Sequence, residues 1–331
     1  MGKDRDIKYF IINITAPLLL SAVLLAGCTK RDLETYPTVL EISLEWPEGV
    51  RPTAAHLHIY HEDGNLLEIH EGLTDGYQGS LPPGNYMLIA HNQDAEHVAY
   101  DNIESHHQAV VYATTPDGRE PTESCFLVEP HNVYGIGQHN EGTTFSVCEG
   151  DTTHLVVMPD RLTKNVRLHF NVKGIYGVTS LGGSLSGVSP SVLLCTCTSV
   201  PLSCLMSFEA EMSQQDQWLA ALELFDLLAG EDSAPGTNNV NVVLEASGNR
   251  YGTVADITPA LKDIIKGNGG TLPQDVELRV TLYFGPLGVL TATVTPWEEV
   301  EGGEGVKPPI AIMLPSRLSI RSGVVVRQVT R

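Results

Sequence analysis

The sequence predicts an all-β protein built from two tandem β-sandwich domains. Many short segments alternate apolar and polar residues, turn residues separate these segments, and few stretches have helical periodicity. Residues 39–46 begin the series and read as a half-buried strand, with polar residues on its outer face. The apolar face of this strand is expected in the core of the first domain and carries Leu40, Ile42, Leu44 and Trp46.

The following strands are marked by the same alternation and by turn residues. Residues 54–60 alternate, and Asp63-Gly64 predicts a tight hairpin into a strand over residues 66–69, because glycine adopts positive φ readily. Pro82 and Pro83 end a further strand, and Gly84 turns the chain into the next one. The other strands predicted in this domain are 109–113, 124–128, 144–147 and 154–158.

A polar stretch over residues 159–165 predicts the boundary between a first domain, residues 28–160, and a second domain, residues 161–300. The glycine-rich run 182–187 predicts a loop, and residues 218–228 mix both periodicities but favour a strand. Residues 258–266 predict a short helix, with Thr258 as N-cap, Pro259 at the first position and Gly267 beyond the end. The strands predicted in the second domain are 166–172, 193–198, 240–246, 251–255, 276–284 and 290–294.

The N-terminal segment has the features of a bacterial secretion signal. Three basic residues precede an apolar run over residues 9–25, which Leu25-Ala26-Gly27-Cys28 closes. A run of this length that ends in small residues indicates a signal peptide, residues 1–27, rather than a membrane span. The ending resembles the lipobox of bacterial lipoproteins, in which Cys28 would carry palmitate-type acyl chains as a membrane anchor. An ordinary secretory signal with a chance cysteine is the alternative.

Composition limits the partners of the body that follows. The chain has a net charge of −20, and removing residues 1–27, which carry +1, leaves a body with a net charge of −21. Such a charge argues against nucleic acid or an anionic membrane surface as a partner. Residues 301–309 read as a linker, and residues 310–331 form a basic tail for which extended and disordered structure both remain open.

Five cysteines remain besides Cys28, and an odd number cannot all pair within one chain. Cys125 and Cys148 are an open pairing that the sequence cannot decide. Cys195 and Cys197, two residues apart, would face one side of the strand predicted over residues 193–198. Small buried apolar side chains are the favoured interpretation of the cysteines.

Histidine is the unusual residue type. Eleven of the twelve histidines lie between His56 and His154. His56 and His58 share one face of a strand, and His106 and His107 form another close pair, so imidazole ligands for zinc or copper are available. No flanking cysteine or carboxylate completes a tetrahedral set, so a polar surface without a metal site is expected.

No catalytic constellation is evident in the sequence. The run from Gly183 to Gly187 lacks the spacing of a nucleophile elbow, and Gly135-Ile136-Gly137 lacks the last glycine of a dinucleotide fingerprint. The carboxylates are scattered, as on a solvated acidic surface. We therefore predict no catalytic residue, no cofactor and no enzyme activity.

Several features in order resemble a known family. They are the lipobox at Cys28, the strand ending at Trp46, the Leu81-Pro82-Pro83-Gly84-Asn85-Tyr86 turn, the step over residues 256–258 into the helix, and Val294-Thr295-Pro296-Trp297. The chain is thereby similar, over about residues 28–300, to the fimbrillin-associated anchor lipoproteins of Bacteroidales, in the minor fimbrial subunit superfamily. The resemblance implies two tandem transthyretin-like β-sandwiches. The basic tail departs from the family pattern.

The resemblance also implies a function. It predicts an outer-membrane, lipid-anchored lipoprotein that serves as anchor or accessory subunit of a fimbrium-like polymer involved in cell adhesion. Fimbrillin-like subunits would dock by adding a strand to an open sheet edge, because main-chain bonds satisfy the exposed edge groups. A glycan-binding surface lipoprotein is the alternative, with Trp218 and Trp297 as the aromatic candidates.

Overall fold

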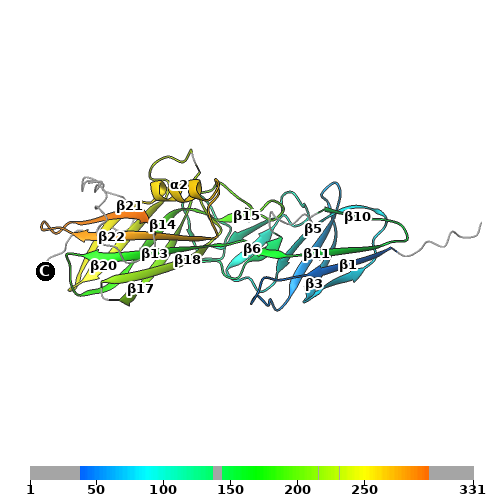
Figure 1. Ribbon diagram of the computed structural model, residues 1–331, viewed down its shortest axis with the longest axis horizontal. Helices are drawn as coiled ribbons and strands as arrows, with labels where there is room; N and C mark the ends of the chain where they lie inside the picture. Colours follow the sequence, from blue (N-terminus) through cyan, green and yellow to red (C-terminus); the bar gives the residue numbers. More distant parts are fainter. Residues whose placement is uncertain (1–37, 137–143, 215, 231, 298–331) are drawn as a thin grey trace, which may run out of the picture.

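The computed structural model describes residues 38–136, 144–214, 216–230 and 232–297. These residues form an elongated molecule of two β-stranded lobes arranged end to end (Figure 1). The prediction of an all-β fold with a short helix is confirmed. Cys28, the predicted signal peptide and the basic tail lie outside the described residues. No helix within the described residues is long and apolar enough to cross a bilayer.

Two sheets pack face to face in the first lobe. Its strands are β1 (Val39–Leu44), β2 (Ala55–His61), β3 (Leu66–Leu73), β4 (Gly76–Gly79), β5 (Gly84–Asn92), β9 (Tyr134–Ile136), β10 (Thr144–Val147), β11 (Thr152–Val157) and β12 (Pro159–Arg161). The smaller sheet has the order β11-β1-β4, and the larger has the order β12-β9-β5-β2-β3, with β10 also paired to β5. β1 runs parallel to β11 and antiparallel to β4.

The core between these sheets follows from the alternation seen in the sequence. Leu40, Ile42 and Leu44 of β1 are buried, and they pack in one cluster with Leu57 of the opposing sheet. Trp46 lies beyond the end of β1, where it is partly buried against the same cluster, with its ring edge-on to Tyr134. The predicted core of the first lobe is therefore present, with Trp46 at its margin.

A third sheet joins the two lobes. It has the order β16-β15-β7-β6 and contains β6 (Val98–Asp101), β7 (Val110–Ala113), β15 (Ser191–Leu193) and β16 (Thr198–Ser199). β6 and β7 precede β9 in the chain, whereas β15 and β16 come from the second half of the chain. Val111 of β7 and Val192 of β15 are opposite each other and belong to one buried cluster that also includes Tyr60 of β2. The domain boundary at residues 160 and 161 stays a prediction.

The second lobe is a ten-stranded sheet that curls around its own core. Its strands are β8 (Phe126–Leu127), β13 (Lys164–Lys173), β14 (Val178–Ser189), β17 (Cys204–Gln214), β18 (Gln217–Leu224), β19 (Asp226–Leu227), β20 (Asn239–Ala246), β21 (Asn249–Asp256), β22 (Asp275–Phe284) and β23 (Leu290–Pro296). The main order is β21-β20-β14-β17-β18-β13-β22-β23. The two ends of this order, β21 and β23, lie alongside each other. The helix α2 (Thr258–Gly267) covers one end of the lobe (Figure 1).

Two expectations about strands in the second lobe are wrong. The glycine-rich run 182–187 lies within β14 rather than in a loop. Gly183 is needed there because a Cβ atom would fall 1.8 Å from the carbonyl oxygen of Asn241 on the neighbouring strand. The strand predicted over residues 193–198 is interrupted by a turn in which Cys197 has φ 53°, so Cys195 and Cys197 do not share a strand face.

The helix also begins differently from the prediction, although its position is as expected. Ile257 holds the N-cap position, and Thr258 is the first helical residue. The Oδ1 atom of Asp256 accepts the backbone N–H of Thr258 at 2.9 Å, so a carboxylate satisfies one of the unpaired amides at the helix start. The strand favoured at residues 218–228 is observed as β18.

Candidate functional site

β11 is the longest regular open edge of the first lobe, within the residues that the structure describes. The longer edge strands of the second lobe, β21 and β23, lie alongside each other. Among the other edges, β4 and β10 have four residues each and β12 has three, including Pro159. β3 is longer, but two register shifts interrupt its pairing with β2. β11 instead keeps one register with β1 over six consecutive residue pairs. Bulges and short lengths protect an edge against strand addition, so β11 is the edge of the first lobe best suited to accept a strand.

The outer side of β11 presents both backbone groups and apolar side chains. The carbonyl oxygens of Asp151 and Val157 accept hydrogen bonds from β1. Backbone groups alternate in direction along a strand. The N–H and C=O groups of His154 and Val156 therefore point away from β1. The side chain of Val156 is 53% exposed, and His154 pairs with Glu41 through an Nδ1 to Oε2 distance of 2.9 Å.

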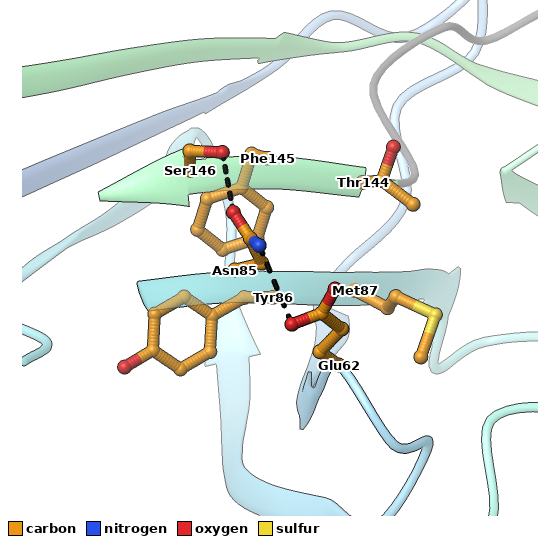
Figure 2. A pocket seen from close by; sticks show the side chains of 7 residues that line it. All are labelled: Glu62, Asn85, Tyr86, Met87, Thr144, Phe145 and Ser146. Atoms are coloured by element: carbon orange, nitrogen blue, oxygen red, sulfur yellow. Dashed lines mark hydrogen bonds between the residues drawn. The ribbon is translucent and has the colours of Figure 1, made fainter. Parts of the chain in front are cut away.

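A hollow of about 260 Å³ lies nearby, where β5 and β10 pair (Figure 2). The Asn85 side chain links its two sides: the Ser146 hydroxyl donates to Oδ1 at 2.7 Å, and Nδ2 donates to the Glu62 carboxylate at 3.3 Å. The rings of Tyr86 and Phe145 stack at 5.7 Å on the buried side. The lining contains one carboxylate, that of Glu62, and no histidine, lysine or cysteine.

Three histidines lie together on the face of the larger sheet that points away from β1. His56 of β2 is directly opposite His91 of β5, and His58 follows on the same face of β2. The Nε2 atoms of His58 and His91 are 3.1 Å apart, and one ring nitrogen from each of the three imidazoles lies within 4.8 Å of the others. Tyr100 of β6 covers the cluster, with its ring stacked on His91 at 3.9 Å.

Burial determines the charge state of this cluster. His58 and His91 are each only 4% exposed, so the expectation that the histidines form a polar surface is wrong for these two. Burial, with a smaller contribution from the neighbouring imidazoles, lowers the pKa of His58 to about 4 and the pKa of His91 to about 3. Both rings are therefore neutral at neutral pH. The sequence could not show that His91 completes the group, because the pairing of β2 with β5 is not visible in it.

A second group of potential ligands is formed by His106, His107 and Cys195, which come from the two halves of the chain. His106 is buried, whereas His107 is exposed. The pairing of Cys125 with Cys148, which the sequence could not decide, is not the arrangement in the structure. The Sγ atom of Cys125 lies 3.5 Å from that of Cys204, and Cys148 is exposed.

The two tryptophans considered as sugar platforms are largely occupied. Trp218 is 6% exposed and belongs to the core of the second lobe, so the expectation that it is free is wrong. Trp297 is 37% exposed, but its ring stacks on His169 at 4.0 Å and also receives the guanidinium of Arg279 at 4.7 Å.

The fold and these surfaces define an all-β protein of two lobes with an open sheet edge in the first lobe. Comparison with known proteins identifies its family. Residues 27–209 match the family described as "Domain of unknown function (DUF5119)", and the chain belongs to this family.

The chain resembles the fimbrillin-associated anchor proteins of Bacteroidales, as the sequence motifs indicated. It is 26% identical over 184 residues to a protein of Bacteroides ovatus named "Putative fimbrium anchoring subunit Fim4B". The match covers 52% of this chain and 53% of that protein, so the chain spans about half the length of the curated relative.

Solved structures share the fold. A "putative adhesin" from Bacteroides ovatus has a TM-score of 0.52 at 16% identity, over 84% of this chain and 99% of that chain. Structures described as "putative polysaccharide binding proteins" from Bacteroides thetaiotaomicron also have a TM-score of 0.52, at 12% identity, over 79% of this chain and 99% of the other. At these identities the similarity shows a shared fold.

Proposed function

We propose that this protein is an outer-membrane lipoprotein that anchors, or serves as an accessory subunit of, a fimbrium-like polymer. The observation that carries the proposal is the open edge of β11, on a chain related to a fimbrium anchoring subunit. In this proposal Cys28 carries the acyl chains, and a fimbrillin-like subunit adds a strand to β11. The role is structural rather than enzymatic.

The arrangement of the molecule suits a connecting role. The described chain begins at the free end of the first lobe, and the β22–β23 hairpin lies at the opposite end of the molecule (Figure 1). Acyl chains on a residue before β1 would hold that end at the membrane, since each buried CH₂ contributes about 0.8 kcal/mol. β11 runs beside β1, so the acceptor edge would stand next to the anchored strand. Main-chain bonds along a six-residue edge supply affinity without requiring a deep pocket.

Strand addition is tested by removing one outward N–H group from the edge. Val156→Pro deletes a donor that points away from β1 and leaves the β1–β11 hydrogen bonds in place. Val156→Thr keeps the donor and the β-propensity, and it serves as the matched control. We expect fimbrillin-like subunits to co-purify with wild type and Val156→Thr but not with Val156→Pro. Equal recovery with all three proteins would exclude β11 as the acceptor edge.

The lipid anchor is tested at Cys28. Cys28→Ala should convert a membrane-bound protein into one released into the soluble fraction, because the acyl chains are the proposed hydrophobic hold. Metabolic labelling with a palmitate analogue should mark the wild type and not the variant. A wild type that remains unlabelled would refute the lipoprotein assignment.

The glycan-binding alternative rests on the partial exposure of Trp297. A glycan array comparing wild type with Trp297→Ala decides it. A specific glycan signal that the substitution abolishes would favour a carbohydrate-binding role over the anchoring role.

A further inference from the structure

We propose that His56, His58 and His91 form a site for one divalent transition-metal ion of the zinc or copper type. This inference is independent of the anchoring role. It reverses the expectation that the chain holds no metal, because the fold contributes a third imidazole from a neighbouring strand.

The ring nitrogens that face one another have the spacing of metal ligands. Zn–N bonds of 2.0–2.1 Å in a tetrahedral site place two ligand nitrogens about 3.3 Å apart. The Nε2 atoms of His58 and His91 are 3.1 Å apart. A nitrogen of His56 lies within 4.8 Å of them. A side-chain rotation that moves this nitrogen by about 1–2 Å would bring it to the spacing of metal ligands. His56 is only partly buried, which leaves room for that movement.

The tautomer of His91 is set for coordination through Nε2. Its Nδ1–H donates to the carbonyl oxygen of Asn92 at 3.0 Å, so the lone pair resides on Nε2. His56 has a related arrangement, with Nδ1 lying 3.9 Å from the Glu71 carboxylate. Metal-bound histidines usually direct the remote ring nitrogen to a backbone carbonyl or a carboxylate. His91 therefore has the outer partner that a metal site needs, and His56 has a carboxylate near its remote nitrogen.

The cluster is poorly satisfied by hydrogen bonds alone. The Nε2 atom of His56 is buried without a hydrogen-bond partner. Such atoms are rare in folded proteins and call for an unseen partner such as an ion. A bound cation would engage the inward lone pairs and hold β2 and β5 together under Tyr100. Water would supply the fourth ligand.

Calorimetry on the untagged protein, stripped of metal with EDTA and then dialysed, tests the site with Zn²⁺. We expect one Zn²⁺ per chain, and a loss of affinity of at least roughly tenfold in both His58→Leu and His91→Leu. His61→Leu removes an exposed histidine from the same strand and should bind as the wild type does. Co²⁺ should give the visible absorption of a tetrahedral complex with the wild type only.

Further variants separate this site from the other group of ligands. Combining His107→Gln with Cys195→Ser disables the second group and should leave Zn²⁺ binding unchanged. His56→Gln, at a partly exposed position, provides a ligand deletion that does not depend on replacing a buried side chain. Zn²⁺ should raise the Tm of the wild type and not that of His56→Gln. The proposal is overturned if wild type lacks a saturable one-to-one site, or if binding is lost only with His107→Gln and Cys195→Ser.

Discussion

Acid should destabilise the metal-free protein through the two buried histidines. The perturbation is a change from pH 8 to pH 5 in the presence of EDTA. The pKa values of His58 and His91 in the folded protein, about 4 and about 3, lie below the unfolded value of 6.5. Stability that depends on keeping these rings neutral is therefore complete above pH 6.5 and is lost as the pH falls towards 4. The unfolded chain takes up protons in that window, whereas the folded chain does not.

The loss of unfolding free energy at pH 5 depends on the histidine pKa of the unfolded chain, because the pKa values of both rings in the folded protein lie at or below about 4. At pH 5 an unfolded histidine with a pKa of 6.5 is stabilised by about 2 kcal/mol through protonation, and the buried ring gains almost nothing. The two histidines together account for about 4 kcal/mol of lost unfolding free energy. Carboxylates elsewhere add their own acid dependence, so the informative quantity is the difference from a variant that lacks both rings.

Urea denaturation at pH 8 and pH 5 measures this difference. The variant with His58→Leu and His91→Leu retains similar side-chain volume and should lose about 4 kcal/mol less than wild type on acidification. His61→Leu, at an exposed position of β2, should show the acid loss of the wild type. The same acid loss in the double variant and in wild type would refute the assignment of buried neutral imidazoles.

Three further predictions follow from the core and the cysteines. Gly183→Ala should cost about 3 kcal/mol or more of unfolding free energy, because its Cβ would meet a backbone carbonyl within a central strand. The control Ser184→Ala adds no atom and should cost about 1 kcal/mol. Equal losses in the two variants would contradict the steric reasoning. Leu57→Ala, at a fully buried site, should cost 2–5 kcal/mol by chemical denaturation, so a near-neutral effect would contradict the assigned core. Diamide should link Cys125 to Cys204 in peptide maps and spare Cys148, because the Sγ atoms of Cys125 and Cys204 lie 3.5 Å apart. A Cys125–Cys148 link would contradict the observed proximity.

The sequence predicts strands well wherever one face is buried and the other is solvated. β1, β10 and β20 alternate cleanly between buried and less buried residues, and the predicted ranges agree with the observed strands to within two residues. The glycine-rich run 182–187 of β14 fails this test because glycine carries no side chain to alternate. Its glycines serve the approach of a neighbouring backbone, which is a property of the folded sheet and not of the local sequence.

The histidine cluster shows a second limit of sequence reasoning. The spacing of His56 and His58 predicts a shared strand face, and that prediction is confirmed. His91 is 33 residues after His58, within an apolar run, and only the antiparallel register of β2 and β5 brings it opposite His56. Burial under β6 depends on still more distant pairing. The type of ligand could therefore be read from the sequence, whereas the number of ligands and their burial could not.

The parallel pairing of β1 with β11 has a mechanical consequence for the proposed anchoring role. Cys28 lies ten residues before the first described residue, and β1 follows directly. A partner strand on β11 that is pulled away from the membrane would load β1 and β11 in opposite directions along their length. Six residue pairs hold these strands in register, and such a load shears all their hydrogen bonds together instead of opening them one at a time. In the proposed role, a load between the partner strand and the anchor would therefore pass through the β1–β11 ladder.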